Sequence, residues 1–254
     1  MKLEQKVAVI TGSGSGIGRA CAIEFAHEGA ILVIADIDDS AAQSTAKKIG
    51  GKAIAVPTDV SDPKSVCLLA ERTLEAFGRV DILVNNAAIQ VNKKVEDTTP
   101  EEWSRQMAVN VGGVFLCSRA FLPELRRTRG AIVNMSSVNG YFAEPYCAGY
   151  CATKAAIIGL TKAMAIDCGP AHVRVNCICP GYIDAGLAEG YFQAQPDPAA
   201  ARRAAGKLHA LGRVGLPEEV ARVAAFLASD ESSFMTGAQV AVDGGFGSGL
   251  PLNS

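Results

Sequence analysis

Long hydrophobic runs are missing from this sequence of 254 residues. Lys, Asp or Arg interrupts every apolar segment before it reaches the roughly 18–20 residues that a membrane-spanning helix needs. The N-terminus runs directly into a strand-like segment, Val7–Ile10, and lacks the apolar run and small-residue cleavage site of a signal peptide. We therefore expect a cytoplasmic protein with no membrane partner.

An excess of charge of either sign is also missing. The chain has 24 Lys and Arg against 26 Asp and Glu, a net charge of −2, and no basic run stands out. Non-specific binding to nucleic acid therefore lacks its main driving force, and no nucleic-acid partner is expected. With 49% hydrophobic and 20% charged residues, the composition also excludes intrinsic disorder.

Histidine is scarce, and cysteine is too sparse for a disulfide scaffold. Eight cysteines in 254 residues are far below the density of small secreted proteins, so free thiols are predicted. In the segment Cys177-Ile178-Cys179 we expect a strand with its two thiols on opposite faces, and only three histidines are available as further ligands. We therefore predict no metal site.

What the sequence does contain is an alternation of short β-branched runs with longer helical patterns, which is typical of parallel strands joined by crossover helices. The predicted fold class is α/β, with a doubly wound parallel sheet of about seven strands. The predicted strands are Val7–Ile10, Ile31–Ala35, Ala53–Val56, Ile82–Val84, Ala131–Asn134, Val173–Ile178 and Gln239–Val242.

No internal repeat and no linker divides the chain, so residues 1–254 are expected to form a single domain. One segment, residues 184–212, is Ala- and Gly-rich and too long for an ordinary connection of about 4–6 residues. Two interpretations are open for it: a movable substrate lid, or a surface insertion with its own helix over Ala199–Ala205.

A glycine-rich turn, Thr11 to Gly18, follows the first strand and leads into a helix. Glycines allow the backbone to approach a pyrophosphate, and the helix N-terminus supplies free N–H donors and about half a positive charge. No Gly-Lys-Ser/Thr follows, which argues against a P-loop nucleotide hydrolase. The alternative is a glycine loop that only turns the chain.

Asp36 stands at the end of the second predicted strand, where a dinucleotide-binding unit places an acid that accepts hydrogen bonds from the adenosine ribose. A carboxylate there would repel a 2′-phosphate, which favours NAD over NADP. The alternative is a simple helix cap for the segment near Asp39.

Tyr150 and Lys154 are spaced i to i+4 near the start of a predicted helix, which brings them to one face. An ammonium beside a phenol favours phenolate, and a base that works near neutrality needs a phenol pKa roughly 3 units below its free value of about 10. Alone, the pair could equally be a solvated surface feature.

Together these motifs resemble the short-chain dehydrogenases/reductases, single-domain enzymes with a Rossmann-like fold. The resemblance covers nearly the whole chain. Its further motifs are Asp59-Val60, Asn85-Asn86-Ala87-Ala88, Asn110, Ser136-Ser137, Pro180-Gly181 and Asp243-Gly244-Gly245. Two positions depart from the family pattern. Ala88 lies where the family usually has glycine, and Ala185 lies where many members have threonine, which puts the nicotinamide contacts in question.

The resemblance implies a role for each matching residue. Tyr150 would be the general acid/base, Ser137 would steady the reacting oxygen, Lys154 would bind the nicotinamide ribose and depress the tyrosine pKa, and Asn110 would hold a proton-relay water. Cofactor contacts are implied for Gly12, Ser15, Gly16, Ile17, Gly18, Asp36, Asp59, Val60, Asn86, Tyr150, Lys154, Pro180 and Ile183. The resemblance also suggests a homotetramer that pairs helices around residues 100–126 and 149–168.

The predicted reaction is hydride transfer between NAD(H) and a secondary alcohol or ketone. A small-molecule substrate such as a sugar, polyol or other hydroxylated ring is slightly favoured over a steroid-like apolar ring. The residues expected near the pocket are Asn139, Tyr141, Glu144, Tyr146, Tyr182, Asp184, Tyr191 and Phe192. The competing functions are an NAD-binding sensor or scaffold without turnover, and a sugar epimerase or dehydratase on the same sheet.

Overall fold

The alternating segments fold into a seven-stranded, all-parallel sheet with the strand order β3-β2-β1-β4-β5-β6-β7. The computed structural model describes residues 1–249, so the last five residues of the predicted domain lie outside the described residues. The strands are β1 Val7–Thr11, β2 Ile31–Asp36, β3 Ala53–Pro57, β4 Ile82–Asn85, β5 Ala131–Met135, β6 Arg174–Pro180 and β7 Gln239–Val242. The predicted Rossmann-like fold class is confirmed, and only the sixth strand is displaced, since it begins one residue later and extends to Pro180 alongside β7.

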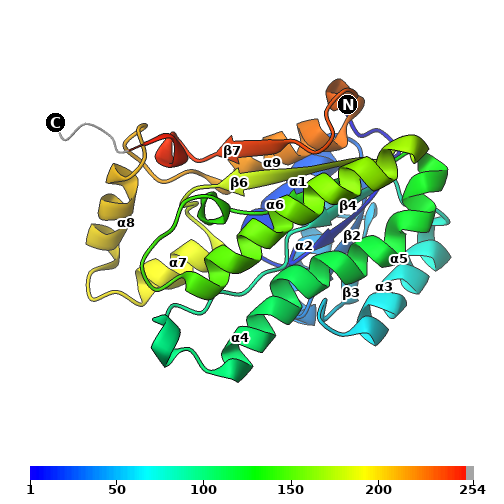
Figure 1. The fold of residues 1–254 in the computed structure, drawn as a ribbon. Coiled ribbons are helices and arrows are strands. Elements are labelled where there is room, and N and C mark those ends of the chain that lie inside the picture. The colour runs from blue at the N-terminus through cyan, green and yellow to red at the C-terminus, as the bar shows by residue number, and fades with distance from the viewer. Residues whose placement is uncertain (250–254) are drawn as a thin grey trace.

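Helices cover both faces of the sheet, and the central strands β1, β4 and β5 are accordingly buried on both sides. They are α1 Gly16–His27, α2 Asp39–Ile49, α3 Pro63–Phe77, α4 Pro100–Met107, α5 Gly113–Thr128, α6 Ala148–Cys168, α7 Gly186–Gln193, α8 Pro198–Lys207 and α9 Pro217–Ala228. Successive residues of β1 point to opposite faces, so Ala8 and Ile10 pack with α1 and α9, while Val9 packs with α3, α5 and α6. Figure 1 shows α5 and α6 in front of the sheet and α1 and α9 behind it.

Side-chain caps define several helix starts. The Thr99 hydroxyl accepts a hydrogen bond from the Glu102 N–H of α4, and the Glu102 carboxylate accepts one from the Thr99 N–H. Asp62 caps α3, which begins at Pro63. These contacts fix where each helix leaves the sheet.

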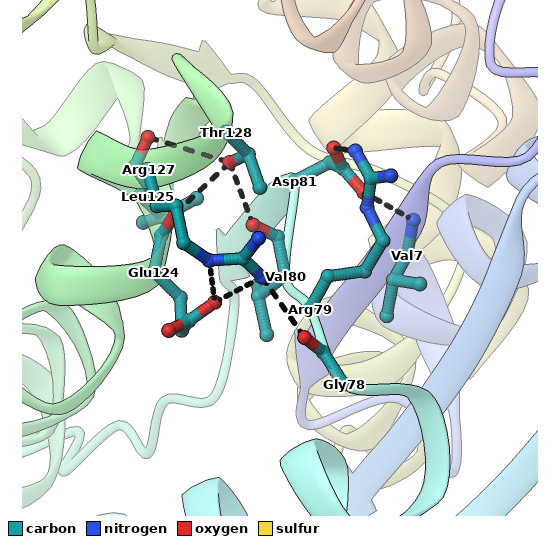
Figure 2. A network of polar contacts seen from close by, with 9 residues as sticks. All are labelled: Val7, Gly78, Arg79, Val80, Asp81, Glu124, Leu125, Arg127 and Thr128. Atoms are coloured by element: carbon teal, nitrogen blue, oxygen red, sulfur yellow. Dashed lines mark hydrogen bonds and ion pairs between the residues drawn. The ribbon is translucent and has the colours of Figure 1, made fainter.

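A polar network ties the elements together where β4 begins, at the end of the sheet opposite the carboxyl ends of the strands (Figure 2). The Asp81 carboxylate is 2% exposed, accepts a hydrogen bond from the Val7 N–H at 2.9 Å and pairs with both Nε and a terminal nitrogen of Arg79. Beside it, Arg127 of α5 donates to the Gly78 carbonyl at 2.9 Å. The network therefore fixes β1, β4 and α5 relative to one another.

All eight cysteines are free thiols, as predicted. The expectation for Cys177 and Cys179 was wrong, however. Residues two apart on a strand face the same side, and both thiols pack together against Ile158 of α6. Across the described residues 1–249, no helix has the length and apolar character needed to cross a bilayer, and no group of three or more His, Cys, Asp or Glu side chains gathers as a metal site.

Candidate active site

A cavity of about 820 Å³ opens where the carboxyl ends of β1, β2, β4, β5 and β6 meet. In Figure 1 this is the end of the sheet toward which the arrows of β6 and β7 point, where α7 and α8 lie. Most of the predicted site residues line it: Gly12, Ser15, Gly16, Ile17, Asp36, Asp59, Val60, Asn86, Ser137, Tyr150, Lys154, Pro180 and Ile183. Two predicted residues, Gly18 and Asn110, lie behind the wall of the cavity.

The glycine turn between β1 and α1 is packed so tightly that side chains are excluded. Gly12 has a φ of +62°, and a Cβ added there would lie 2.8 Å from the Cα of Ala87. The Asn86 side chain donates to the carbonyls of Thr11 and Gly12, both at 3.0 Å, and so fixes the turn from the neighbouring strand. Gly18 packs directly against the Gly12 carbonyl, so its role is the close approach of α1 to the turn.

The Asp36 carboxylate lies at the rim of the cavity and is oriented by backbone donors. One oxygen accepts from the Gly14 N–H at 2.8 Å and the other from the Asp38 N–H at 3.0 Å. Asp38 is the cap of α2, since its carboxylate accepts from the Ala41 N–H. Asp36 is therefore not the helix cap that the alternative interpretation required, and its remaining acceptor sites face the cavity.

Asp59 anchors the cavity wall that follows β3. Burial raises the pKa of this carboxyl, but hydrogen bonds from Ser61 and Arg105 outweigh it and hold the pKa of Asp59 below its usual value. Arg105 reaches across from α4 and itself lines the cavity. Sequence reasoning missed Arg105, because nothing in the local pattern of α4 indicates a partner more than forty residues earlier in the chain.

Ser137, Tyr150 and Lys154 converge on the same part of the cavity. Lys154 is 2% exposed, its ammonium lies 5.3 Å from the centre of the Tyr150 ring, and it donates to the Met135 carbonyl at 2.8 Å. The Ser137 hydroxyl accepts from the Asn139 N–H at 3.1 Å and donates to the Asn139 side-chain oxygen at 3.3 Å, and it lines the same cavity as Tyr150. Hence a hydroxyl, a phenol and an ammonium share one partly enclosed space.

In the chain alone, burial is the main influence on the pKa values of Tyr150 and Lys154. Burial raises the pKa of Tyr150, and the nearby Ser137 hydroxyl lowers that pKa only in part. Burial likewise lowers the pKa of Lys154 from 10.5 to about 8. The expectation that Lys154 depresses the tyrosine pKa applies to the site with its nicotinamide bound and stays a prediction. In the chain alone, burial is the largest cause of both shifts.

Asn110 lies in a turn of π-helix, Ala108–Gly112, between α4 and α5. Its side chain is fully buried, accepts from the Ile89 N–H at 2.8 Å, and donates to the Ile89 carbonyl at 2.9 Å and the Thr153 hydroxyl at 3.1 Å. Thr153 in turn donates to the Tyr150 carbonyl. Asn110 thus connects the loop after β4 to α6, the helix that carries Tyr150.

The segment 184–212 contains two helices, α7 and α8, rather than the single helix expected over Ala199–Ala205. Arg202 of α8 pairs with Asp184 and with Glu189 of α7, and its guanidinium lies over the Phe192 ring at 5.3 Å. These contacts join α7 and α8. Ala185, Gly186, Leu187, Ala188, Tyr191 and Leu208 complete the cavity wall.

The other pocket residues expected from the sequence divide into two groups. Asn139, Glu144, Tyr146, Tyr182 and Tyr191 line the cavity as expected. Three do not: the Tyr141 phenol donates to Asp243, Asp184 pairs with Arg202, and Phe192 is buried. Side chains from the loop after β4, Gln90 and Asn92, also line the cavity and were not predicted.

Comparison with known proteins gives consistent matches along the chain. A family model described as enoyl-(acyl carrier protein) reductase matches residues 12–247. A meso-2,3-butanediol dehydrogenase of Serratia marcescens is 43% identical over 246 residues, which are 96% of each chain. An NADP-dependent (R)-specific alcohol dehydrogenase of Lentilactobacillus kefiri is 39% identical, covering 96% of this chain and 98% of that protein.

Solved structures show the same likeness in three dimensions. A 3-ketoacyl-(acyl-carrier-protein) reductase from Brucella melitensis, complexed with NADH, superimposes with a TM-score of 0.91 at 37% identity, over 96% of this chain and 99% of that one. The ligand-free aldohexose dehydrogenase of Thermoplasma acidophilum has a TM-score of 0.91 at 34% identity, over 99% and 98%.

Proposed function

Since this chain belongs to the short-chain dehydrogenase/reductase family and is an oxidoreductase of CH–OH groups, we propose that it interconverts a secondary alcohol and a ketone with NAD(H). The observation that carries the proposal is the single cavity in which Asp36, the glycine turn and the group Ser137, Tyr150 and Lys154 all meet. The proposed substrate is a small hydroxylated molecule.

The residues of the cavity fit a nicotinamide dinucleotide. The turn at Gly12 leaves no room for a side chain. The backbone N–H groups at the start of α1 are therefore accessible to a pyrophosphate. Asp36 is oriented to accept from ribose hydroxyls, and Asp59 and Val60 would frame the adenine. When bound, NAD⁺ supplies the hydride acceptor for the carbinol hydrogen.

Tyr150 is proposed as the proton carrier of the reaction. In alcohol oxidation its phenolate takes the hydroxyl proton while the carbinol C–H bond breaks and the carbonyl forms; in ketone reduction its phenol returns the proton. Ser137 would hold the reacting oxygen by a hydrogen bond. Lys154 would bind the nicotinamide ribose. Asn110 would hold the water that relays the proton, close to Tyr150 because its side chain donates to Thr153, which in turn donates to the Tyr150 carbonyl.

A preference for NAD over NADP is proposed from Asp36. Its carboxylate is held by the Gly14 and Asp38 amides and cannot turn away without losing both bonds. A 2′-phosphate placed there would meet a like charge at short range, which disfavours NADP. The relatives named above include both an NADH complex and an NADP-dependent enzyme, so the proposal rests on this residue rather than on the family.

Self-association into a homotetramer is proposed through the face formed by α4, α5 and α6. Apolar side chains are exposed on each of these helices: Trp103 on α4, Phe115 on α5 and Ile166 on α6. Figure 1 shows α5 and α6 lying across this face of the sheet. Light scattering of the purified protein would test the proposal, and a mass equal to one chain would contradict it.

The function is tested by following nicotinamide absorbance with a panel of secondary alcohols and ketones. Tyr150→Phe is expected to lower the rate by about 10²–10⁴ if the phenol carries the proton, while NADH binding, followed by fluorescence, is retained. Tyr141→Phe is the matched control, because that phenol faces Asp243 outside the cavity. Turnover at the wild-type rate by Tyr150→Phe would remove the residue from the mechanism.

A further inference from the structure

Glu144 places a carboxylate in the wall of the cavity that also holds Tyr150. It lies in the loop before α6 and accepts a hydrogen bond from the Tyr182 hydroxyl at 2.8 Å. The Tyr182 ring is stacked on the rings of Phe192 and Phe246, with centre distances of 6.0 and 6.1 Å. Glu144 is therefore held by a donor that is itself fixed by packing.

Only one oxygen of this carboxylate, Oε1, has a hydrogen-bond partner among residues 1–249, and none of the salt bridges in that part of the chain includes Glu144. A carboxylate can accept about four hydrogen bonds. Oε2 thus keeps its full acceptor capacity at the cavity wall, where a bound molecule can donate to it.

The charge of Glu144 acts on the reacting group. After burial, which is the largest cause, the Glu144 carboxylate raises the pKa of Cys147, to about 11, and contributes to the raised pKa of Tyr150. A group whose charge acts on the Tyr150 phenol also acts on a substrate whose oxygen is bound to that phenol. Position and charge therefore both direct Glu144 toward the substrate.

We propose that Glu144 is a specificity-determining residue that selects substrates with a second hydroxyl beside the reacting carbinol, vicinal diols and hydroxyketones, and rejects anionic substrates. The inference rests on the proposed function and names its substrate class. Charge-assisted hydrogen bonds are the strong ones, so the second hydroxyl would donate to Oε2. A carboxylate or phosphate on the substrate would instead be repelled.

Three further polar groups that line the cavity favour a hydroxyl over an ammonium as the donor. Gln90, Asn92 and Asn139 are neutral amides, which offer donors as well as acceptors. A hydroxyl can donate to Glu144 and accept from an amide at once, whereas an ammonium can only donate. A neutral diol therefore satisfies more of the cavity wall than an amino alcohol does.

The test compares four substrates of similar size with NAD⁺: 2,3-butanediol, sec-butanol, the amino alcohol of the same carbon skeleton, and lactate. We expect kcat/KM for the diol to exceed that for sec-butanol by about 10- to 100-fold, the value of one hydrogen bond to a charged group that water partly screens. Glu144→Gln should reduce this ratio by about tenfold, mainly through KM, and raise the relative activity on lactate.

Glu96→Gln is the matched control, since Glu96 is exposed and lies outside the cavity, and it should leave the ratio unchanged. An unaltered ratio in Glu144→Gln, or a preference for the amino alcohol over the diol, would overturn the inference while leaving the proposed function in place. Failure of the wild-type protein to oxidise any of the alcohols would instead overturn the proposed function, and this inference with it.

Discussion

Replacing Lys154 by Met should abolish activity, and it should make the protein without cofactor more stable. The side chain is 2% exposed, and burial lowers its pKa from 10.5 to about 8. At 1.36 kcal/mol per unit, holding the ammonium in this site at neutral pH costs about 3 kcal/mol. Met has a similar length and no charge, but it loses the hydrogen bond to the Met135 carbonyl, worth about 1 kcal/mol. The net gain is about 2 kcal/mol, or an increase in Tm of about 4–8 °C for a chain of this size.

The free-energy cost of the buried ammonium should depend on pH, whereas a change in packing alone would not. Between pH 8 and 10.5 the folded chain holds Lys154 neutral while the unfolded chain is still protonated. The unfolded state then binds the extra proton, so the lysine's contribution to the free energy of unfolding rises with pH across this window. Below pH 8 both states are protonated and the full cost remains.

Urea denaturation at a series of pH values, without cofactor, measures the effect. The difference in unfolding free energy between Lys154→Met and wild type should be greatest at neutral pH and shrink toward pH 10.5. Lys162→Met is the control, because Lys162 is exposed on the same helix. A variant that is destabilised by several kcal/mol at pH 7, with a difference that does not vary with pH, would refute the reasoning.

Two further perturbations act at opposite ends of the sheet. Asp36→Ala removes the charge at the cavity rim, so kcat/KM with NADP⁺ should rise by about tenfold or more relative to NAD⁺. The control Asp39→Ala lies outside the cavity and should leave this ratio unchanged. No gain with NADP⁺ would show that another group excludes the phosphate. Asp81→Ala leaves the buried Val7 N–H without its acceptor and should lower the unfolding free energy in urea by about 1–3 kcal/mol; an unchanged urea midpoint would count against a structural role of the network in Figure 2.

The sheet could be predicted from the sequence because its signals are local. Each strand is a short β-branched run, and capping groups such as Thr99 mark where helices begin. The position of Asp36 also follows from local order, since a residue that ends a parallel strand lies at the carboxyl edge of the sheet. For these features, position in the chain determines position in space.

Contacts across long sequence distances could not be predicted in this way. Arg105 donates to Asp59, 46 residues away in the sequence, and Asn110 is hydrogen-bonded to Ile89 in the loop after β4 and to Thr153 on α6. The pattern around each residue is that of an ordinary helix, so the residue type alone does not reveal its partner. The i to i+4 spacing of Tyr150 and Lys154 did predict their proximity, but it could not predict how far burial would shift both pKa values.

That burial connects stability with activity at this site. The site shields both groups from water, and this shielding raises the pKa of Tyr150 and lowers that of Lys154. In the chain alone the raised pKa of Tyr150 disfavours the phenolate that alcohol oxidation needs and favours the protonated phenol that ketone reduction uses. We therefore expect that a positive charge bound beside Tyr150 would lower the pKa of its phenol and so favour alcohol oxidation.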